Sequence, residues 1–132
     1  MMNDVVSTIM TKDLLTVSPS DNLNKVKEIL INHRIHHVPV VEGKKLVGLV
    51  TTYDLFKLEV DHKDYGTTKV SDVMTKKLAF IEPGDKVGTA AEIFMEHLFH
   101  AVPVVQDGDL VGIVTSFDVL KYEYNKEYPA RN

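Results

Sequence analysis

The sequence predicts an α/β (α+β) fold built from two copies of one β-α-β-β-α unit. Three observations support this prediction: an internal repeat, paired runs of β-branched residues, and apolar residues at helical spacing. A shift of 64 positions aligns residues 6–58 with residues 70–122 without a gap. Chance does not keep one register over such a length, and two similar halves that share an interface and are related by a pseudo-twofold axis are the expected arrangement.

The repeat defines the predicted domain organisation. Met10-Thr11-Lys12 aligns with Met74-Thr75-Lys76, and the Val-Pro-Val-Val segment at 38–41 aligns with the same segment at 102–105. We therefore predict a first domain at 6–58 and a second at 70–122. The polar stretch 59–69 is the predicted linker, and 123–132 is predicted to be a polar C-terminal tail.

Each copy begins with a predicted strand and an amphipathic helix. In the first copy, Leu14 to Val17 is apolar and ends at Ser18-Pro19, and Ser20 or Asp21 is placed to cap the helix that follows. Apolar residues recur at helical spacing in both helices: Leu23, Val26 and Leu30 in the first, and Val87, Ala90, Ala91, Phe94 and Leu98 in the second.

Each copy continues with a predicted hairpin and a short helix. Val38 to Val41 and Leu46 to Thr51 are rich in β-branched residues and flank a turn that contains Gly43. In the second copy the glycine of the turn, Gly108, stands one residue later, so we expect the two turns to differ in geometry. The predicted short helices are Thr52 to Leu58 and Ser116 to Tyr122.

Composition excludes several classes of protein. The chain has 132 residues, a net charge of −4 and no cysteine. Charges of both signs are interspersed, which disfavours binding to nucleic acid or to an anionic membrane surface. No apolar run is long enough for a membrane span, and no Lys or Arg precedes Lys12, so we expect neither a membrane anchor nor a signal peptide. The absence of cysteine favours a cytoplasmic location.

The motif Gly-x-Val-Thr-x-x-Asp ends the last strand of each copy and contains Thr51 and Asp54, then Thr115 and Asp118. One interpretation is a capping box at the start of a helix. Asp is short for the reach back to the N-cap amide, however, which would leave its carboxylate free. A carboxylate at this junction could accept hydrogen bonds from two ribose hydroxyls while the helix N-terminus attracts an anion.

Histidines precede the Val-Pro segment of each copy, and three interpretations stay open. His33 with His36, and His97 with His100, form H-x-x-H pairs that could bind a metal. Histidine at a helix C-terminus also interacts favourably with the helix dipole, and we prefer this interpretation for His33 and His97. His36, His37 and His100 could instead donate hydrogen bonds to a phosphate, best as imidazolium, so that binding would weaken as pH rises.

No catalytic arrangement is evident, and we do not expect an enzyme. The sequence has no Cys nucleophile, no Gly-x-Ser-x-Gly motif, and none of the glycine-rich phosphate loops of P-loop or Rossmann proteins.

Together these motifs resemble the cystathionine-β-synthase (CBS) domain, present as a tandem pair over residues 6–122. The resemblance rests on Met-Thr at the start of each copy, on Pro-Val-Val, and on Leu-Val-Gly-x-Val-Thr-x-x-Asp. It implies a Bateman module, in which two β-α-β-β-α units pack their sheets together with flanking helices and leave two clefts. Such modules commonly bind AMP, ADP, ATP or S-adenosylmethionine and often dimerise. No cofactor is required, and the ligand is regulatory.

The resemblance implies that each cleft combines residues of both copies. The first would contain Thr16, His36, His37, Val38, Thr115, Ser116 and Asp118. The second would contain His100, Val102, Thr51 and Asp54 together with Phe80. The aspartates would hold ribose hydroxyls, and the main chain near Val38 the adenine edge. The family's His-Arg pair is absent here, and Phe80 and Glu82 replace Thr16 and Ser18, so the cleft of Asp118 is expected to bind better.

The leading hypothesis is a cytoplasmic, non-catalytic sensor of an adenosyl ligand. Ligand binding would change the relative angle of the two copies, and a partner protein or a second protomer would read this change. The alternative is a ligand-free dimerisation module, with metal binding through the histidine pairs as a third. A homodimer is expected because apolar residues near Leu55, Phe56 and Leu58 need cover.

Overall fold

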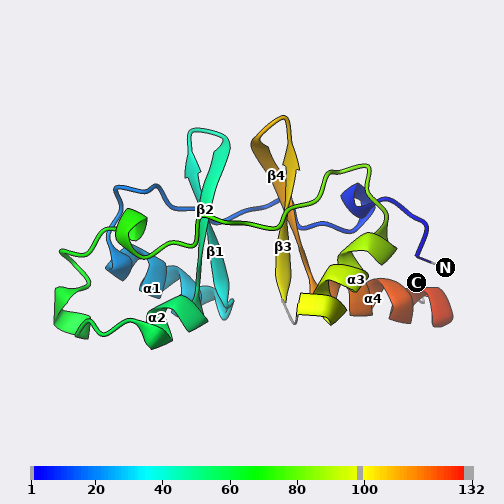
Figure 1. Cartoon of the computed structure of the whole chain (residues 1–132). Helices are drawn as coiled ribbons and strands as arrows, with labels where there is room; N and C mark the ends of the chain where they lie inside the picture. The colour runs from blue at the N-terminus through cyan, green and yellow to red at the C-terminus, as the bar shows by residue number, and fades with distance from the viewer. Residues whose placement is uncertain (1, 98–99, 130–132) are drawn as a thin grey trace. The chain divides into compact units, whose positions relative to one another are not determined.

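Two compact units make up the chain, and each contains a piece of both sequence repeats (Figure 1). The computed structural model describes residues 2–97 and 100–129. Unit 1 comprises Met1–Leu14 and Ala79–Asn132, and unit 2 comprises Leu15–Leu78. The opening segment of the first repeat therefore packs with the second repeat. The opening segment of the second repeat packs with the first.

Unit 2 holds an antiparallel hairpin with helices beside it. Its regular elements are α1 (Leu23–His33), β1 (His37–Glu42), β2 (Lys45–Thr51), α2 (Thr52–Lys57), and the 3-10 turns η2 (His62–Asp64) and η3 (Val70–Asp72). Strand β1 pairs with β2, and the register shifts between Val40 and Val41. Because Val40 faces Gly48 and Val41 faces Leu46, Val47 is the extra residue of a β-bulge.

Unit 1 repeats this design with the same register. Its elements are η1 (Val6–Thr8), α3 (Val87–His97), β3 (Ala101–Gln106), β4 (Asp109–Thr115) and α4 (Ser116–Glu127). The bulge recurs between Val104 and Val105. The α+β class predicted from the sequence is confirmed.

The predicted first strand of each repeat is wrong in its extent. Over Leu14 to Val17, only Val17 makes a bridge, parallel to Val40. The Val17 amide donates to Pro39 O at 3.1 Å, and Val17 O accepts from the Val41 amide at 2.9 Å. The chain then turns at once, because the Asp21 carboxylate accepts from the Ser18 amide at 2.7 Å. Pro19, which has no N–H, could not have continued the pairing.

Helix ends also differ from the prediction. Asn22, rather than Ser20 or Asp21, is the N-cap of α1, and its side chain accepts from the Lys25 amide. Asp21 is unavailable because it closes the preceding turn. Helix α4 runs to Glu127, so the predicted polar tail at 123–132 begins as helix. Leu98, predicted on the apolar face of the second helix, lies outside the described residues.

The two hairpin turns differ in geometry, which confirms the prediction from their glycines. In the first hairpin Gly43 has φ +61°, and Lys44, which follows it, does not have a positive φ. In the second hairpin both central residues have positive φ, Asp107 at 53° and Gly108 at 84°. These values are those of type II′ and type I′ turns, respectively, which both match the twist of a hairpin.

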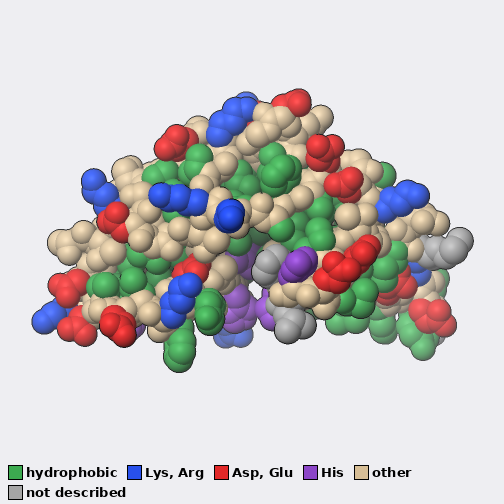
Figure 2. All heavy atoms as spheres, in the orientation of Figure 1, with side chains coloured by type: hydrophobic (Ala, Val, Ile, Leu, Met, Phe, Trp, Pro, Cys, Tyr) green, Lys and Arg blue, Asp and Glu red, His purple; other side chains and the backbone are tan. Residues whose placement is uncertain are grey.

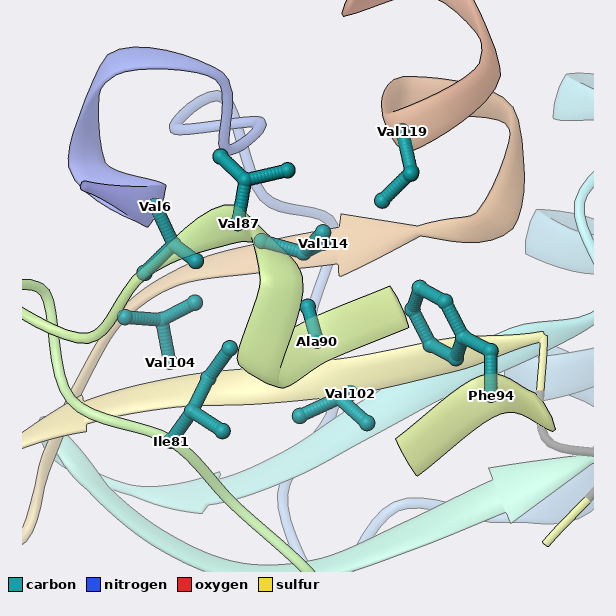
Figure 3. Close-up of a cluster of buried hydrophobic side chains, with 9 residues drawn as sticks. All are labelled: Val6, Ile81, Val87, Ala90, Phe94, Val102, Val104, Val114 and Val119. Carbon is teal, nitrogen blue, oxygen red and sulfur yellow. The ribbon is translucent and has the colours of Figure 1, made fainter. Parts of the chain in front are cut away.

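Each unit has its own hydrophobic core, to which the opening segment of the other repeat contributes. We call this the exchanged segment; it is 6–14 in unit 1 and 70–78 in unit 2. In unit 1, Val6 of η1 points into the same cluster as Val102, Val104 and Val114 of the hairpin (Figure 3). Val70 takes the equivalent place in unit 2, and both valines are fully buried. Burial of a valine side chain contributes about 1.5–3 kcal/mol, so each exchanged segment is firmly attached to its unit.

A methionine of each exchanged segment covers a glycine of the hairpin. A Cβ atom added to Gly112 would lie 2.4 Å from Met10 Sδ, and one added to Gly48 would lie 2.6 Å from Met74 Sδ. Main-chain hydrogen bonds continue the contact, because Thr11 pairs with Ile113 and Thr75 pairs with Leu49. A larger residue at either position would force the methionine side chain to move, so glycine suits this close approach.

The stretch 59–69, predicted to be a linker, is itself packed. Tyr65 is buried in the core of unit 2, and its ring stacks on His62 with the ring centroids 4.9 Å apart.

The surface charge agrees with the balanced charge of the sequence, because blue and red side chains are interspersed over the face drawn in Figure 2. Among the helices within residues 2–97 and 100–129, none combines the length and the apolar character that crossing a membrane requires.

Candidate functional site

A reciprocal capping box opens the last helix of each unit. In unit 1 the Asp118 amide donates to Thr115 Oγ1 at 3.1 Å, and Asp118 Oδ2 accepts from the Thr115 amide at 2.9 Å. Thr51 and Asp54 make the same two bonds in unit 2. The expectation that Asp is too short to reach back to the N-cap amide is therefore wrong. The strand residue before the helix is extended, and this brings its amide within reach of the shorter side chain.

The two aspartates differ in what else they contact. Asp54 is 6% exposed, and the Thr75 hydroxyl lies 3.3 Å from its Oδ1 and 3.4 Å from its Oδ2. Asp118 is half-buried, and within the described residues its Oδ1 has no hydrogen-bond partner. Thr11, the repeat equivalent of Thr75, is exposed. Oδ1 of Asp118 in unit 1 is therefore open, whereas Oδ1 of Asp54 in unit 2 is engaged by Thr75.

Main-chain contacts bring the histidine segments to the same helix starts. The Ser116 amide donates to His100 O at 2.9 Å in unit 1, and the Thr52 amide donates to His36 O at 2.9 Å in unit 2. His37 is the cross-strand partner of Thr51. Each unit therefore gathers a histidine, a threonine and an aspartate at the open end of its hairpin. In unit 1, exposed Ser116 adds a hydroxyl at the first turn of α4.

The predicted site residues Val38 and Val102 lie on β1 and β3, and Thr16 lies before the Val17 bridge. Val38 and Val102 are fully buried, so their side chains belong to the cores and only their main chains are available to a ligand. Thr16 is partly exposed and immediately precedes the Val17 bridge in unit 2.

His33 and His97 lie at helix ends. They are the last residues of α1 and α3, the position that the sequence predicted for them. Across residues 2–97 and 100–129, no three His, Cys, Asp or Glu side chains gather closely enough to hold a metal ion.

A hollow of about 430 Å³ in unit 1 adds residues that sequence reasoning missed. It lies between the N-terminal segment and one face of α4, and its lining includes Asp118, Lys121, Asn125 and Ile9. Asp118, Lys121 and Asn125 of α4 are three, four and seven positions apart, which is the spacing of one helix face. The pattern was hidden because the sequence predicted a helix that ended at Tyr122.

A cluster of charged and aromatic side chains closes one end of this hollow. The Tyr122 hydroxyl donates to Asp4 Oδ2, and Lys126 Nζ lies 3.8 Å from the same oxygen. Lys126 also lies over the Tyr122 ring, 4.6 Å from its centroid. The contact with the Tyr122 side chain raises the pKa of Lys126, which keeps this group charged. The cluster attaches the N-terminal segment to α4.

Comparison with known proteins agrees with the repeat. A family model described as the CBS domain matches twice, at residues 6–61 and 70–125. The chain belongs to the CBS domain family. It carries two CBS domains in tandem, and the residues of the capping boxes lie within the two matched ranges.

Individual CBS proteins are similar over most of this chain. Inosine-5′-monophosphate dehydrogenase of Korarchaeum cryptofilum is 34% identical over 119 residues, which is 89% of this chain and 23% of the dehydrogenase. The solved structure of CBSX2 in complex with AMP is 30% identical, has a TM-score of 0.84, and is covered to 98% by 93% of this chain. The CBS domain pair of MJ0100 in complex with 5′-methylthioadenosine and S-adenosyl-L-methionine is 28% identical, has a TM-score of 0.79, and is covered to 98% by 94% of this chain.

The chain spans about a quarter to a half of the first curated relatives it matches, with shares of 23%, 47% and 24%. Two of these relatives are enzymes, inosine-5′-monophosphate dehydrogenase and homoserine O-acetyltransferase. The similarity to them is limited to their CBS portion.

Proposed function

We propose that this CBS pair is a non-catalytic regulatory module that binds an adenosyl ligand: AMP, ADP, ATP or S-adenosylmethionine. The observation that carries the proposal is the Asp118 carboxylate. It is held in place by the capping box, yet one oxygen is free among the described residues. A positioned carboxylate in the same first turn of α4 as the exposed Ser116 suits the hydroxyls of a ribose, since both side chains are strong hydrogen-bonding groups.

Two similar CBS structures support the choice of ligand. CBSX2 is complexed with AMP, and the MJ0100 pair with 5′-methylthioadenosine and S-adenosyl-L-methionine. All three of these ligands contain adenosine. In this proposal Asp118 and Thr115 hold the sugar, and His36, His37 and His100 offer further hydrogen-bond donors to the ligand. The pairing of residues from both repeats in each site stays a prediction from the family resemblance.

Isothermal titration calorimetry with AMP, ADP, ATP, S-adenosylmethionine and adenosine tests the proposal. A ligand at 100 times its Kd stabilises the folded protein by about 2.7 kcal/mol, on the order of ten degrees in Tm for a domain of this size. We expect heat from at least one member of the panel and a matching rise in Tm. If every compound gives neither heat nor a Tm shift at millimolar concentration, the sensor function is wrong.

A ligand-free dimerisation module is the second candidate, and a specific observation favours it. Helices α2 and α4 expose large apolar side chains, and hydrophobic side chains gather over both helices in Figure 2. The exposed fractions are 67% for Tyr53, 89% for Phe56, 66% for Phe117 and 65% for Leu120. Leu55 and Leu58, by contrast, pack against the core of unit 2. We propose a cytoplasmic homodimer that covers the exposed set, whether or not a ligand binds.

A further inference from the structure

The hollow beside α4 contains an unpaired positive charge next to the open carboxylate oxygen. Lys121 lines the hollow one helical turn after Asp118, and within the described residues its Nζ has no hydrogen bond or ion pair. The other lysine of the hollow, Lys126, is already paired with Asp4. Lys121 is therefore the cation that remains available to a ligand.

The neighbouring groups restrict what that ligand can be. Asn125 lines the hollow one turn after Lys121 and offers both a donor and an acceptor. Ile9 adds an apolar contact from the N-terminal segment. Asp118 would repel a bare anion that bound to Lys121, because residues three apart on a helix are about 5–6 Å apart. A ligand that presents hydroxyls to Asp118 and its anionic group to Lys121 satisfies both.

We infer that Lys121 and Asn125 form an anion subsite that extends the Asp118 site along α4 and selects a ligand carrying both sugar hydroxyls and a phosphate. This inference rests on the proposed function, since it requires the sugar to lie at Asp118. A volume of about 430 Å³ falls within the range of small-molecule sites. A nucleoside monophosphate contains both groups, whereas a nucleoside without phosphate contains only one.

The first repeat provides a matched control. Lys57 is the repeat equivalent of Lys121, but its Nζ lies over the Tyr53 ring, 5.2 Å from the centroid. Helix α2 ends at Lys57, whereas α4 continues for more than a turn past Lys121. Asp61, the equivalent of Asn125, therefore does not lie on the helix and carries a negative charge. The same substitution at Lys57 removes an exposed lysine without removing the subsite.

The experiment is calorimetric titration of AMP, adenosine and inorganic phosphate into wild-type protein, Lys121→Met and Lys57→Met. We expect AMP to bind wild type more tightly than adenosine and inorganic phosphate not to bind. Loss of one charge-assisted hydrogen bond should weaken the affinity for AMP about 10- to 100-fold in Lys121→Met. The affinity for adenosine should stay within about twofold of the wild-type value. Lys57→Met should keep both affinities. Circular dichroism and Tm confirm that the variants fold.

Each other outcome decides against a distinct claim. If Lys121→Met weakens AMP and adenosine equally, or if wild type binds them equally, the anion subsite is wrong and the adenosyl site stands. If Lys57→Met weakens AMP binding more than Lys121→Met does, the anion subsite lies in unit 2 and its assignment to unit 1 is wrong. If wild type binds neither AMP nor adenosine nor any other adenosyl compound of the panel, the proposed function fails, and this inference fails with it.

Discussion

The Thr75 hydroxyl lies within 3.4 Å of both carboxylate oxygens of Asp54. Thr75 belongs to the exchanged segment of unit 2, and its contact engages the one oxygen that the capping box leaves open. Asp118 has no such contact among the described residues. The two repeats therefore offer unequal carboxylates although their motifs are the same.

This inequality predicts unequal effects on ligand binding. Asp118→Ala should abolish the tighter binding event, whereas Asp54→Ala should leave it within about threefold, since the loss of a charged hydrogen bond costs about 1.5–3 kcal/mol. Calorimetry with the best adenosyl ligand measures both. Asp54→Ala should lose more stability than Asp118→Ala, because it also removes the contact with Thr75, and circular dichroism is the control that both variants fold. A greater loss of affinity in Asp54→Ala would show that the sites are wrongly assigned.

Gly112→Ala should destabilise the protein by about 1–3 kcal/mol because the new methyl group would overlap Met10. Urea denaturation measures the change in the free energy of unfolding. The double variant Met10→Ala, Gly112→Ala should lose less than the sum of the single losses, since removal of the methionine removes the overlap. Strict additivity would mean that the N-terminal segment does not pack on β4.

Asp21 should make the fold sensitive to acid. The hydrogen bond from the Ser18 amide, assisted by Lys25, lowers the pKa of Asp21 below its ordinary value of 3.8. A lowered pKa contributes stability that is present above the unfolded-state pKa and is lost as pH falls through the folded-state pKa. The decrease in Tm from pH 6 to pH 3 should therefore be larger for the wild-type protein than for Asp21→Asn. Asp13→Asn, at an exposed position, should retain the wild-type pH dependence.

Glu123→Met should raise the stability of unit 1. Glu123 Oε1 is buried and has no hydrogen-bond partner among the described residues, and such an acceptor costs about 1–3 kcal/mol. Methionine keeps the length of the side chain without the buried oxygen. Thermal unfolding should show a gain of a few degrees, compared with no gain for Glu127→Met at the exposed end of the same helix. A loss in Glu123→Met would indicate that the carboxylate has a partner.

The exposed apolar residues of α2 and α4 predict that the protein sediments as a dimer rather than as a 14.9 kDa monomer. Phe56→Glu combined with Leu120→Glu should give the monomer at tens of micromolar with an unchanged circular dichroism spectrum, because both side chains are more than half exposed. Ile31→Glu, at a position 63% exposed on α1, is the control and should remain dimeric. If the wild-type protein sediments as a monomer, the proposed homodimer is wrong.

Much of the fold and part of the site could be predicted from the sequence, because these features depend on residues close together in the chain. The hairpins follow from β-branched runs around Gly43 and Gly108, and the helix starts follow from Thr-x-x-Asp, whereas the β-bulges did not show in the pattern. Local geometry nevertheless decided details that patterns miss. Asp21 closes a turn and leaves the cap to Asn22, and α4 continues beyond the end of the repeat.

Only the tertiary structure decided which hairpin each opening segment joins. Met10 and Met74 follow the same local pattern, and Gly48 and Gly112 provide the same space, so the sequence allows either pairing. In the structure Met10 covers Gly112, about a hundred positions away, and Met74 covers Gly48. Contacts between such distant positions depend on the packing of the whole unit rather than on local propensity. The same packing places Thr75 against Asp54 and opens the hollow beside Lys121, and so makes two equal motifs into unequal sites.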